Sequence, residues 1–102
     1  MDAAGIFATD VGGIEWADAL VAIIDGADPD SGTSWEVGYA YGRGKPAVIV
    51  RTDFRYLAGD AGPYNPLIAE SATVRIGLPA ASTTEVINAL LEALSTIEDR
   101  AR

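Results

Sequence analysis

Two short apolar segments, each ending in a polar residue, constrain the fold more than any other feature of this sequence. The first spans residues 19–25 and the second residues 47–51, and the helix-start signal Thr33-Ser-Trp-Glu36 lies between them. Continuous apolar runs of this length are typical of strands that are buried on both faces of a parallel sheet. A strand, a helix and a second strand in this order predict an α/β fold with a parallel sheet, in which the helix makes a right-handed crossover between the two strands.

The rest of the chain extends this unit on both sides. A helix over residues 6–16 is expected to be weakened by Gly12 and Gly13, and the capping box Ser82-Thr-Thr-Glu85 begins the clearest helix. The length of 102 residues is that of a single domain, residues 1–102. The predicted order is helix 6–16, strand 19–25, helix 33–43, strand 47–51, loop 52–65, short helix 66–71, strand 73–77 and a helix from residue 82 onward.

Composition excludes several classes of function. The sequence has no cysteine and no histidine, so disulfides, Cys/His zinc sites and histidine-based triads are excluded. A net charge of −8 argues against a nucleic-acid partner, because such a protein needs a basic face. No apolar run approaches the roughly 20 residues of a membrane span, and the first residues carry no basic signal-peptide region. We expect a cytoplasmic protein without a membrane partner, in which carboxylates perform the chemistry.

The acidic surface also bears on the source of the protein. Nine of the 15 acidic residues are aspartate, and Lys45 is the single lysine beside six arginines. Such a surface stays soluble in concentrated salt, so a halophilic source is a hypothesis that the salt dependence of the melting temperature would test.

Acidic residues gather where the first predicted strand ends. Asp25, Asp28 and Asp30 follow the strand, and Glu36 lies in the first turn of the predicted helix. Ligands of parallel α/β proteins bind at the carboxyl ends of the strands, so we expect these carboxylates to crowd one site. A glutamate at a helix N-terminus stays ionised, which suits a nucleophile, and an acid in a drier setting suits a proton donor. Such a pair is typical of reactions at an anomeric carbon.

Each of these residues also has a plainer interpretation. Glu36 is at the right spacing to be the partner of a Thr33 helix cap, and Asp28 and Asp30 are common loop formers. An acidic cluster also binds Mg²⁺ or Ca²⁺ in many proteins, although Asp28-Pro-Asp-Ser-Gly32 lacks the ligand spacing of a calcium loop. The aromatic residues Trp35, Tyr39 and Tyr41 are expected to belong to the core, and Asp10 and Asp18 to be solvated helix residues.

Several motifs, taken in order, resemble those of the nucleoside 2-deoxyribosyltransferase family. They are an Ala17-Asp18 pair before a hydrophobic strand, Asp30-Ser-Gly-Thr-Ser-Trp-Glu-Val-Gly38, Gly44-Lys-Pro46, Arg51-Thr-Asp-Phe-Arg55 and Tyr64-Asn-Pro-Leu67. The resemblance covers roughly residues 9–71. It implies a flavodoxin-like, Rossmann-like parallel sheet. It also implies an enzyme of nucleotide salvage that cleaves the N-glycosidic bond of 2′-deoxynucleosides and transfers the sugar to another nucleobase, with no cofactor and no metal.

The resemblance also implies roles for individual residues. Glu36 matches the nucleophile that forms a deoxyribosyl ester, and Asp10 matches the acid that protonates the departing base. Asp30 matches the residue that holds the sugar 5′-hydroxyl, with Gly32 and Thr33 of the same motif in the substrate site. Asn65 matches a residue that reaches into a neighbouring subunit's site, so the resemblance implies a homodimer or a larger assembly with shared sites.

The chain departs from the family pattern at its start. The family opens with a strand, a Gly-Pro-aromatic loop, a helix and a second strand, and nothing in residues 1–8 matches these elements. We therefore expect a fold truncated at its N-terminus, with about three strands and flanking helices. One alternative is that the chain is an inactive nucleoside-binding or structural remnant.

A related branch of the family gives a second alternative, the hydrolysis of deoxynucleoside 5′-monophosphates. That branch uses hydroxyl residues where this chain has Asp30 and Asn65. An aspartate facing a phosphate would repel it, which favours a nucleoside substrate, whereas the neighbouring Ser31 keeps the nucleotide alternative open.

Overall fold

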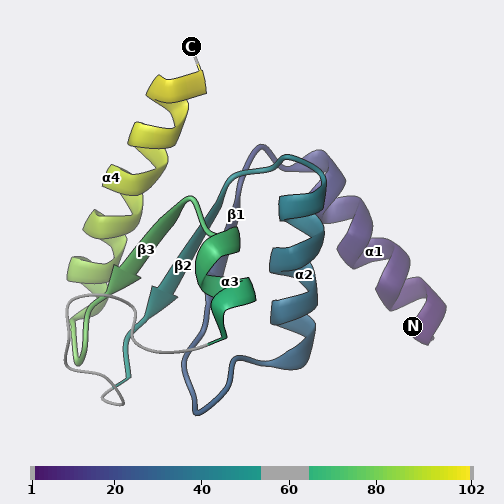
Figure 1. Cartoon of the computed structure of the whole chain (residues 1–102), viewed down its shortest axis with the longest axis horizontal. Helices are drawn as coiled ribbons and strands as arrows, with labels where there is room; N and C mark the ends of the chain where they lie inside the picture. Colours follow the sequence, from purple (N-terminus) through teal and green to yellow (C-terminus); the bar gives the residue numbers. More distant parts are fainter. Residues whose placement is uncertain (1, 54–64, 102) are drawn as a thin grey trace.

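The computed structural model describes residues 2–53 and 65–101, which form a three-stranded parallel sheet flanked by helices (Figure 1). The sheet has the order β1-β2-β3. The α/β prediction is therefore confirmed. The elements are α1 (Ala3–Trp16), β1 (Leu20–Ile23), α2 (Ser31–Gly42), β2 (Ala47–Arg51), α3 (Pro66–Ser71), β3 (Val74–Gly77) and α4 (Thr83–Ala101).

Helices cover the two faces of the sheet in separate layers. On one face α2 and α3 pack over a core cluster, and on the other face α4 packs over a second cluster. The helix α2 lies between α1 and α3 (Figure 1). The first cluster holds Ala22, Ile24, Val37, Ile49 and Ile68, and the second holds Val48, Val50, Ile76 and Ala93. None of the described helices is long and apolar enough to cross a membrane.

The two predicted strands of the first unit differ in burial. All five residues of β2 are buried, as the sequence predicts. The prediction is wrong for β1, because Val21 and Ile23 are 41% and 63% exposed. These side chains share a face with Val48 and Val50, their partners in the ladder, and the cluster under α4 holds residues of β2 and β3 but none of β1. Among the residues that the structure describes, β1 is therefore covered on one face only.

The helix α2 begins earlier than the sequence signal indicates. Its N-cap is Asp30, whose carboxylate accepts a hydrogen bond of 3.0 Å from the Thr33 amide. The capping box predicted at Thr33 is therefore wrong, and Glu36 lies in the second turn rather than the first. The predicted C-terminus is close to the observed one, since α2 ends at Gly42 and Gly44 turns the chain with a φ of +72°.

The other elements agree well with their patterns. The short helix α3 has the predicted bounds, and α4 has the predicted capping box, in which Ser82 and Glu85 exchange two hydrogen bonds of 3.2 Å. The helix α1 begins three residues before the predicted start, because Asp2 caps it by accepting from the Gly5 amide at 2.7 Å. Most of the predicted loop 52–65 lies outside the described residues.

Candidate functional site

Three hollows of the surface meet at Glu36. A hollow of about 270 Å³ lies between α1, β1 and α2, and its lining includes Asp10, Ile14, Leu20 and Lys45 as well as Glu36. A second, of about 390 Å³, lies between the N-terminal halves of α1 and α2. A third, of about 310 Å³, runs along β1 and is closed by Thr33 and Glu36. The half-buried Glu36 side chain is the residue that the three hollows share.

The structure brings Asp10 to the same place. Asp10 is exposed on α1 and lines two of the three hollows together with Glu36. Over residues 2–53 and 65–101, neither carboxylate accepts a hydrogen bond or joins an ion pair. Two carboxylates that face common hollows in this way are available to a ligand. This arrangement can present a nucleophile and a proton donor to the same bound small molecule.

Asp30, Gly32 and Thr33 form the helix cap at the start of α2, which the sequence predicted at Thr33 and Glu36. Oδ2 of Asp30 accepts from the Thr33 amide at 3.0 Å and from its hydroxyl at 3.4 Å. A Cβ at Gly32 would lie 3.2 Å from the same Oδ2, so a glycine there leaves room for the cap. Gly32 and Thr33 each line a hollow with Glu36. Asp30 is therefore the N-cap of α2.

Asn65 is separate from this group. It is the exposed N-cap of α3, where its Oδ1 accepts from the Leu67 amide at 2.9 Å. None of the three hollows at Glu36 includes it. Its expected role lies in a neighbouring subunit's site, which a single chain does not contain.

The expected crowding of carboxylates after the first strand is wrong. Asp25 turns toward the end of β2, where it accepts from the amide and hydroxyl of Thr52 at 2.6 Å each and from the Asp53 amide at 3.3 Å. Asp28 does not line the hollows at Glu36. In the described parts of the chain, no three acidic side chains are grouped so that they could hold a metal ion.

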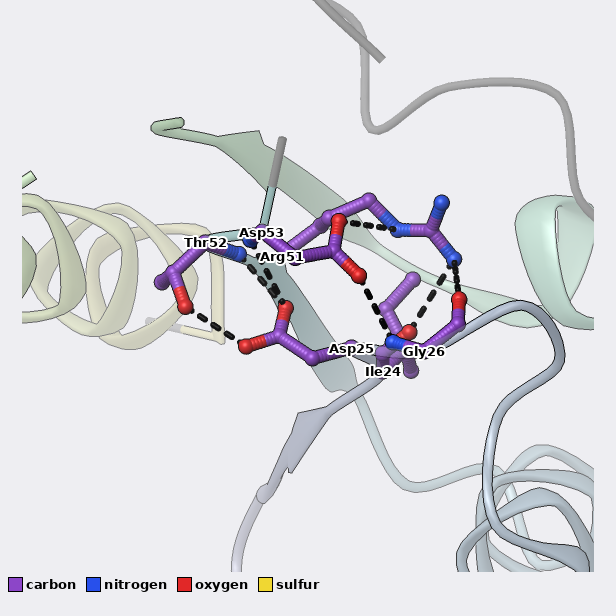
Figure 2. A network of polar contacts seen from close by, with 6 residues as sticks. All are labelled: Ile24, Asp25, Gly26, Arg51, Thr52 and Asp53. Carbon is purple, nitrogen blue, oxygen red and sulfur yellow. Dashed lines mark hydrogen bonds and ion pairs between the residues drawn. The ribbon is translucent and has the colours of Figure 1, made fainter. Parts of the chain in front are cut away.

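A buried arginine beside this turn was not predicted from the sequence. Arg51 is 2% exposed, and its Nη2 donates to the carbonyls of Ile24 and Gly26 at 3.1 and 3.2 Å. The carboxylate of Asp53 accepts from the Gly26 amide at 2.7 Å and lies 3.9 Å from Nε of Arg51 (Figure 2). These contacts fix the start of the loop that leads to α2. The signal in the sequence is the charged pair of Arg51 and Asp53 at the end of an otherwise apolar strand.

The ends of α1 and α2 are joined by a polar clasp, which we define as Glu15, Tyr39, Arg43 and Lys45. Glu15 accepts from the Tyr39 hydroxyl and from Arg43, whose Nε and Nη2 lie 2.8 and 2.9 Å away. The hydrogen bond from Tyr39, followed by that from Arg43, holds the pKa of Glu15 below its usual value. The same bond raises the pKa of Tyr39, because a phenolate would face a carboxylate.

Aromatic residues form one wall of the second hollow. Trp35 packs edge-on against Phe7 with ring centroids 5.7 Å apart, and stacks on Tyr39 at 5.2 Å. Trp35 is 48% exposed and Tyr41 is exposed, so the expectation that they belong to the core is wrong. The wall makes this hollow largely apolar, with Asp10 and Glu36 as its charged members.

A comparison with known proteins agrees with the family motifs found in the sequence. The family model of nucleoside 2-deoxyribosyltransferases matches residues 1–91, a longer stretch than the motifs themselves span. It takes in all of α1 and the first half of α4 as well as both candidate carboxylates. No curated protein matches the chain. Since the matched stretch covers most of the sequence, the chain belongs to the nucleoside 2-deoxyribosyltransferase family.

Proposed function

We propose that this chain is an N-deoxyribosyltransferase that moves 2-deoxyribose from one nucleobase to another. The observation that carries the proposal is the pair Asp10 and Glu36, which line the same two hollows and have no partner among the described side chains. Membership of the family supports the choice of an N-glycosidic bond as the bond that is cleaved. The absence of cysteine and histidine from the sequence leaves a carboxylate as the natural nucleophile.

The proposed reaction has two steps and uses no cofactor and no metal. A carboxylate oxygen of Glu36 attacks C1′ of the sugar while the bond from C1′ to the base nitrogen breaks, and Asp10 gives its proton to that nitrogen. The product is a deoxyribosyl ester of Glu36 and a free base. A nitrogen of a second base then attacks C1′, its proton passes to Asp10, and the ester bond breaks. Two inversions at C1′ give net retention.

The size of the hollows is consistent with a nucleoside as the ligand. Ligand pockets commonly have volumes of about 300–1,000 Å³, and the two hollows shared by Asp10 and Glu36 together fall in this range. Under the proposal, Asp30 holds the sugar 5′-hydroxyl, with Gly32 and Thr33 beside it. A carboxylate at that position repels a 5′-phosphate, which favours a nucleoside over a nucleotide.

The proposal includes an assembly of at least two subunits of this single-domain chain. Asn65 would enter the site of the partner subunit and complete the contacts of the sugar. Leu67, two residues after Asn65, is 78% exposed in the single chain, which supports a contact surface at the start of α3.

A base-exchange assay tests the proposed function. The purified chain is incubated with 2′-deoxyinosine and adenine, and the products are separated by chromatography. We expect 2′-deoxyadenosine from the wild type and none from Glu36→Ala, while Asp99→Ala, which changes an exposed carboxylate on α4, keeps full activity. Mass spectrometry of the chain quenched without acceptor should show a deoxyribosyl adduct that is absent from Glu36→Ala.

The other outcomes identify the alternatives. Release of hypoxanthine without a new nucleoside would mean that water resolves the ester and that the chain is a hydrolase. Activity on 2′-deoxyinosine 5′-monophosphate alone would indicate the nucleotide branch. A folded chain that is inactive on all these substrates would contradict the proposed function and favour a binding or structural role.

A further inference from the structure

The helix that carries Asp10 is held by few apolar contacts. Ile14 is the buried residue of α1, whereas Ile6, Phe7 and Trp16 are each at least half exposed. The described apolar anchor of its N-terminal half is the edge-on contact of Phe7 with Trp35. The direction of α1, and with it the place of Asp10, therefore depends strongly on what holds its other end.

Lys45 holds that end. Its ammonium donates to the carbonyls of Glu15 and Ala17 at 3.0 and 2.7 Å, which are among the last carbonyls of α1. Such carbonyls lack partners within a helix and carry its negative end, and α1 has no basic residue in its own last turn. The backbone amide of Lys45 meanwhile donates to the Ala40 carbonyl of α2 at 2.8 Å. One residue thus ties the C-terminal ends of both helices together.

Glu15 adds a second tie between the same two helices. Its side chain projects from α1 and accepts from Tyr39 of α2 and from Arg43, the C-cap of α2. Together with Lys45, these contacts complete the polar clasp. The clasp is polar and local, so it fixes the distance and angle between α1 and α2 at one end.

The clasp also borders the candidate site. Lys45 lines the hollow of about 270 Å³ together with Asp10 and Glu36. The described hydrogen bonds of the Lys45 ammonium go to backbone carbonyls, and none of the described ion pairs joins Lys45 to Asp10 or Glu36. Lys45 therefore bears on the site through the placement of α1. Loss of the clasp would let α1 shift and change the separation of Asp10 from Glu36.

We propose that Lys45, Glu15 and Tyr39 are positioning residues that hold Asp10 in place for proton transfer to the departing base. This inference rests on the proposed function, in which Asp10 is the acid. A misplaced acid slows the departure of bases that need a proton and spares bases that leave without one. A displacement of about 1 Å is enough for a large loss of rate in such geometry.

The test measures the first step alone on two donors. Rapid-quench release of base, without acceptor, is followed with 2′-deoxyadenosine, whose base needs a proton, and with 7-methyl-2′-deoxyguanosine, whose cationic base leaves without one. For Lys45→Met and Tyr39→Phe we expect a loss of about 10-fold on the first donor and a change within about 2-fold on the second. Asp10→Asn should show the same selectivity with a larger loss.

Controls separate positioning from charge and from folding. Tyr39→Phe removes one hydroxyl and leaves every formal charge of the clasp in place, so its effect does not arise from a change of net charge. Tyr41→Phe removes a hydroxyl from an exposed tyrosine of the same helix and should change neither rate. Circular dichroism and the melting temperature show whether each variant is folded.

Two results would overturn the inference while leaving the proposed function intact. The first is an equal loss of rate on both donors, which would mean a general structural role. The second is an unchanged rate of base release in folded Lys45→Met and folded Tyr39→Phe. A wild-type chain that releases base from neither donor would overturn the proposed function, and this inference with it.

Discussion

At the scale of single residues, Arg51 is the side chain whose loss should cost the fold most. It is 2% exposed and contacts two carbonyls and a carboxylate at the ends of β1 and β2. Arg51→Met keeps the apolar stem and leaves these groups without their cation. Removing one member of a buried charged group costs about 3–5 kcal/mol, so we expect a loss near the lower end of that range, because Asp53 is partly exposed.

Urea denaturation measures this loss as a change in the free energy of unfolding. The matched control is Arg75→Met, an exposed arginine on β3, for which we expect a change within about 0.5 kcal/mol. A similar small change for Arg51→Met would mean that the contacts in Figure 2 contribute little to stability.

The family resemblance predicts which carboxylates face a common site better than residue types and spacing do. Asp10 and Glu36 were paired through the family resemblance, and the fold places both at the same hollows. Asp25 was expected beside them and instead bonds to Thr52. Asp25 lies beyond the end of β1, where the alternation of a strand no longer sets the direction of a side chain, and its partner at the end of β2 decides that direction.

At the scale of elements, the pairing of α1 with α2 should depend on pH. Glu15 has a pKa below its usual value of about 4.5 because Tyr39 and Arg43 donate to the ionised form, with Lys45 adding a favourable charge. A lowered pKa in the folded state stabilises the protein at pH values above the usual pKa. That stabilisation is lost as the pH falls through the lower folded value.

The melting temperature, measured from pH 7 down to pH 3, should therefore fall less for Glu15→Gln than for the wild type, relative to their values at pH 7. Glu92→Gln, which changes an exposed glutamate on α4, should follow the wild-type curve. Parallel curves for the wild type and Glu15→Gln would contradict the contact between the two helices. The raised pKa of Tyr39 matters at high pH. Its contribution to the stability of the folded state is present below about pH 10 and is lost as the pH rises above that value.

Elements bounded by local signals were predictable to within a few residues. The bounds of β2 and α3 were predicted correctly, because Pro46 and Pro66 mark their starts and the apolar run marks the rest. The burial of β1 was not predictable in the same way. Its apolar run is like that of β2, but burial depends on what covers a strand, and the described cluster under α4 holds residues of β2 and β3 and none of β1.

At the scale of the whole molecule, the proposed sharing of sites between subunits predicts complementation. Glu36→Ala and Asn65→Ala would each be inactive or weak alone, since every site of such a dimer has one defect. In a mixed dimer, one site combines the intact Glu36 of one subunit with the intact Asn65 of the other. One site in two is therefore intact in each mixed dimer, so we expect the isolated mixed dimer to have roughly half of the wild-type activity.

The matched control is the pair Glu36→Ala and Asp10→Asn. Because Asp10 and Glu36 line the same hollows of one chain, every site in their mixed dimer keeps one defect, and no activity should return. Co-expression of differently tagged chains, followed by purification on both tags, isolates the mixed dimers for the exchange assay. Recovery in the control pair would place the two carboxylates in different subunits. Failure of both pairs, with each assembly still dimeric by light scattering, would mean that Asn65 does not complete the partner's site.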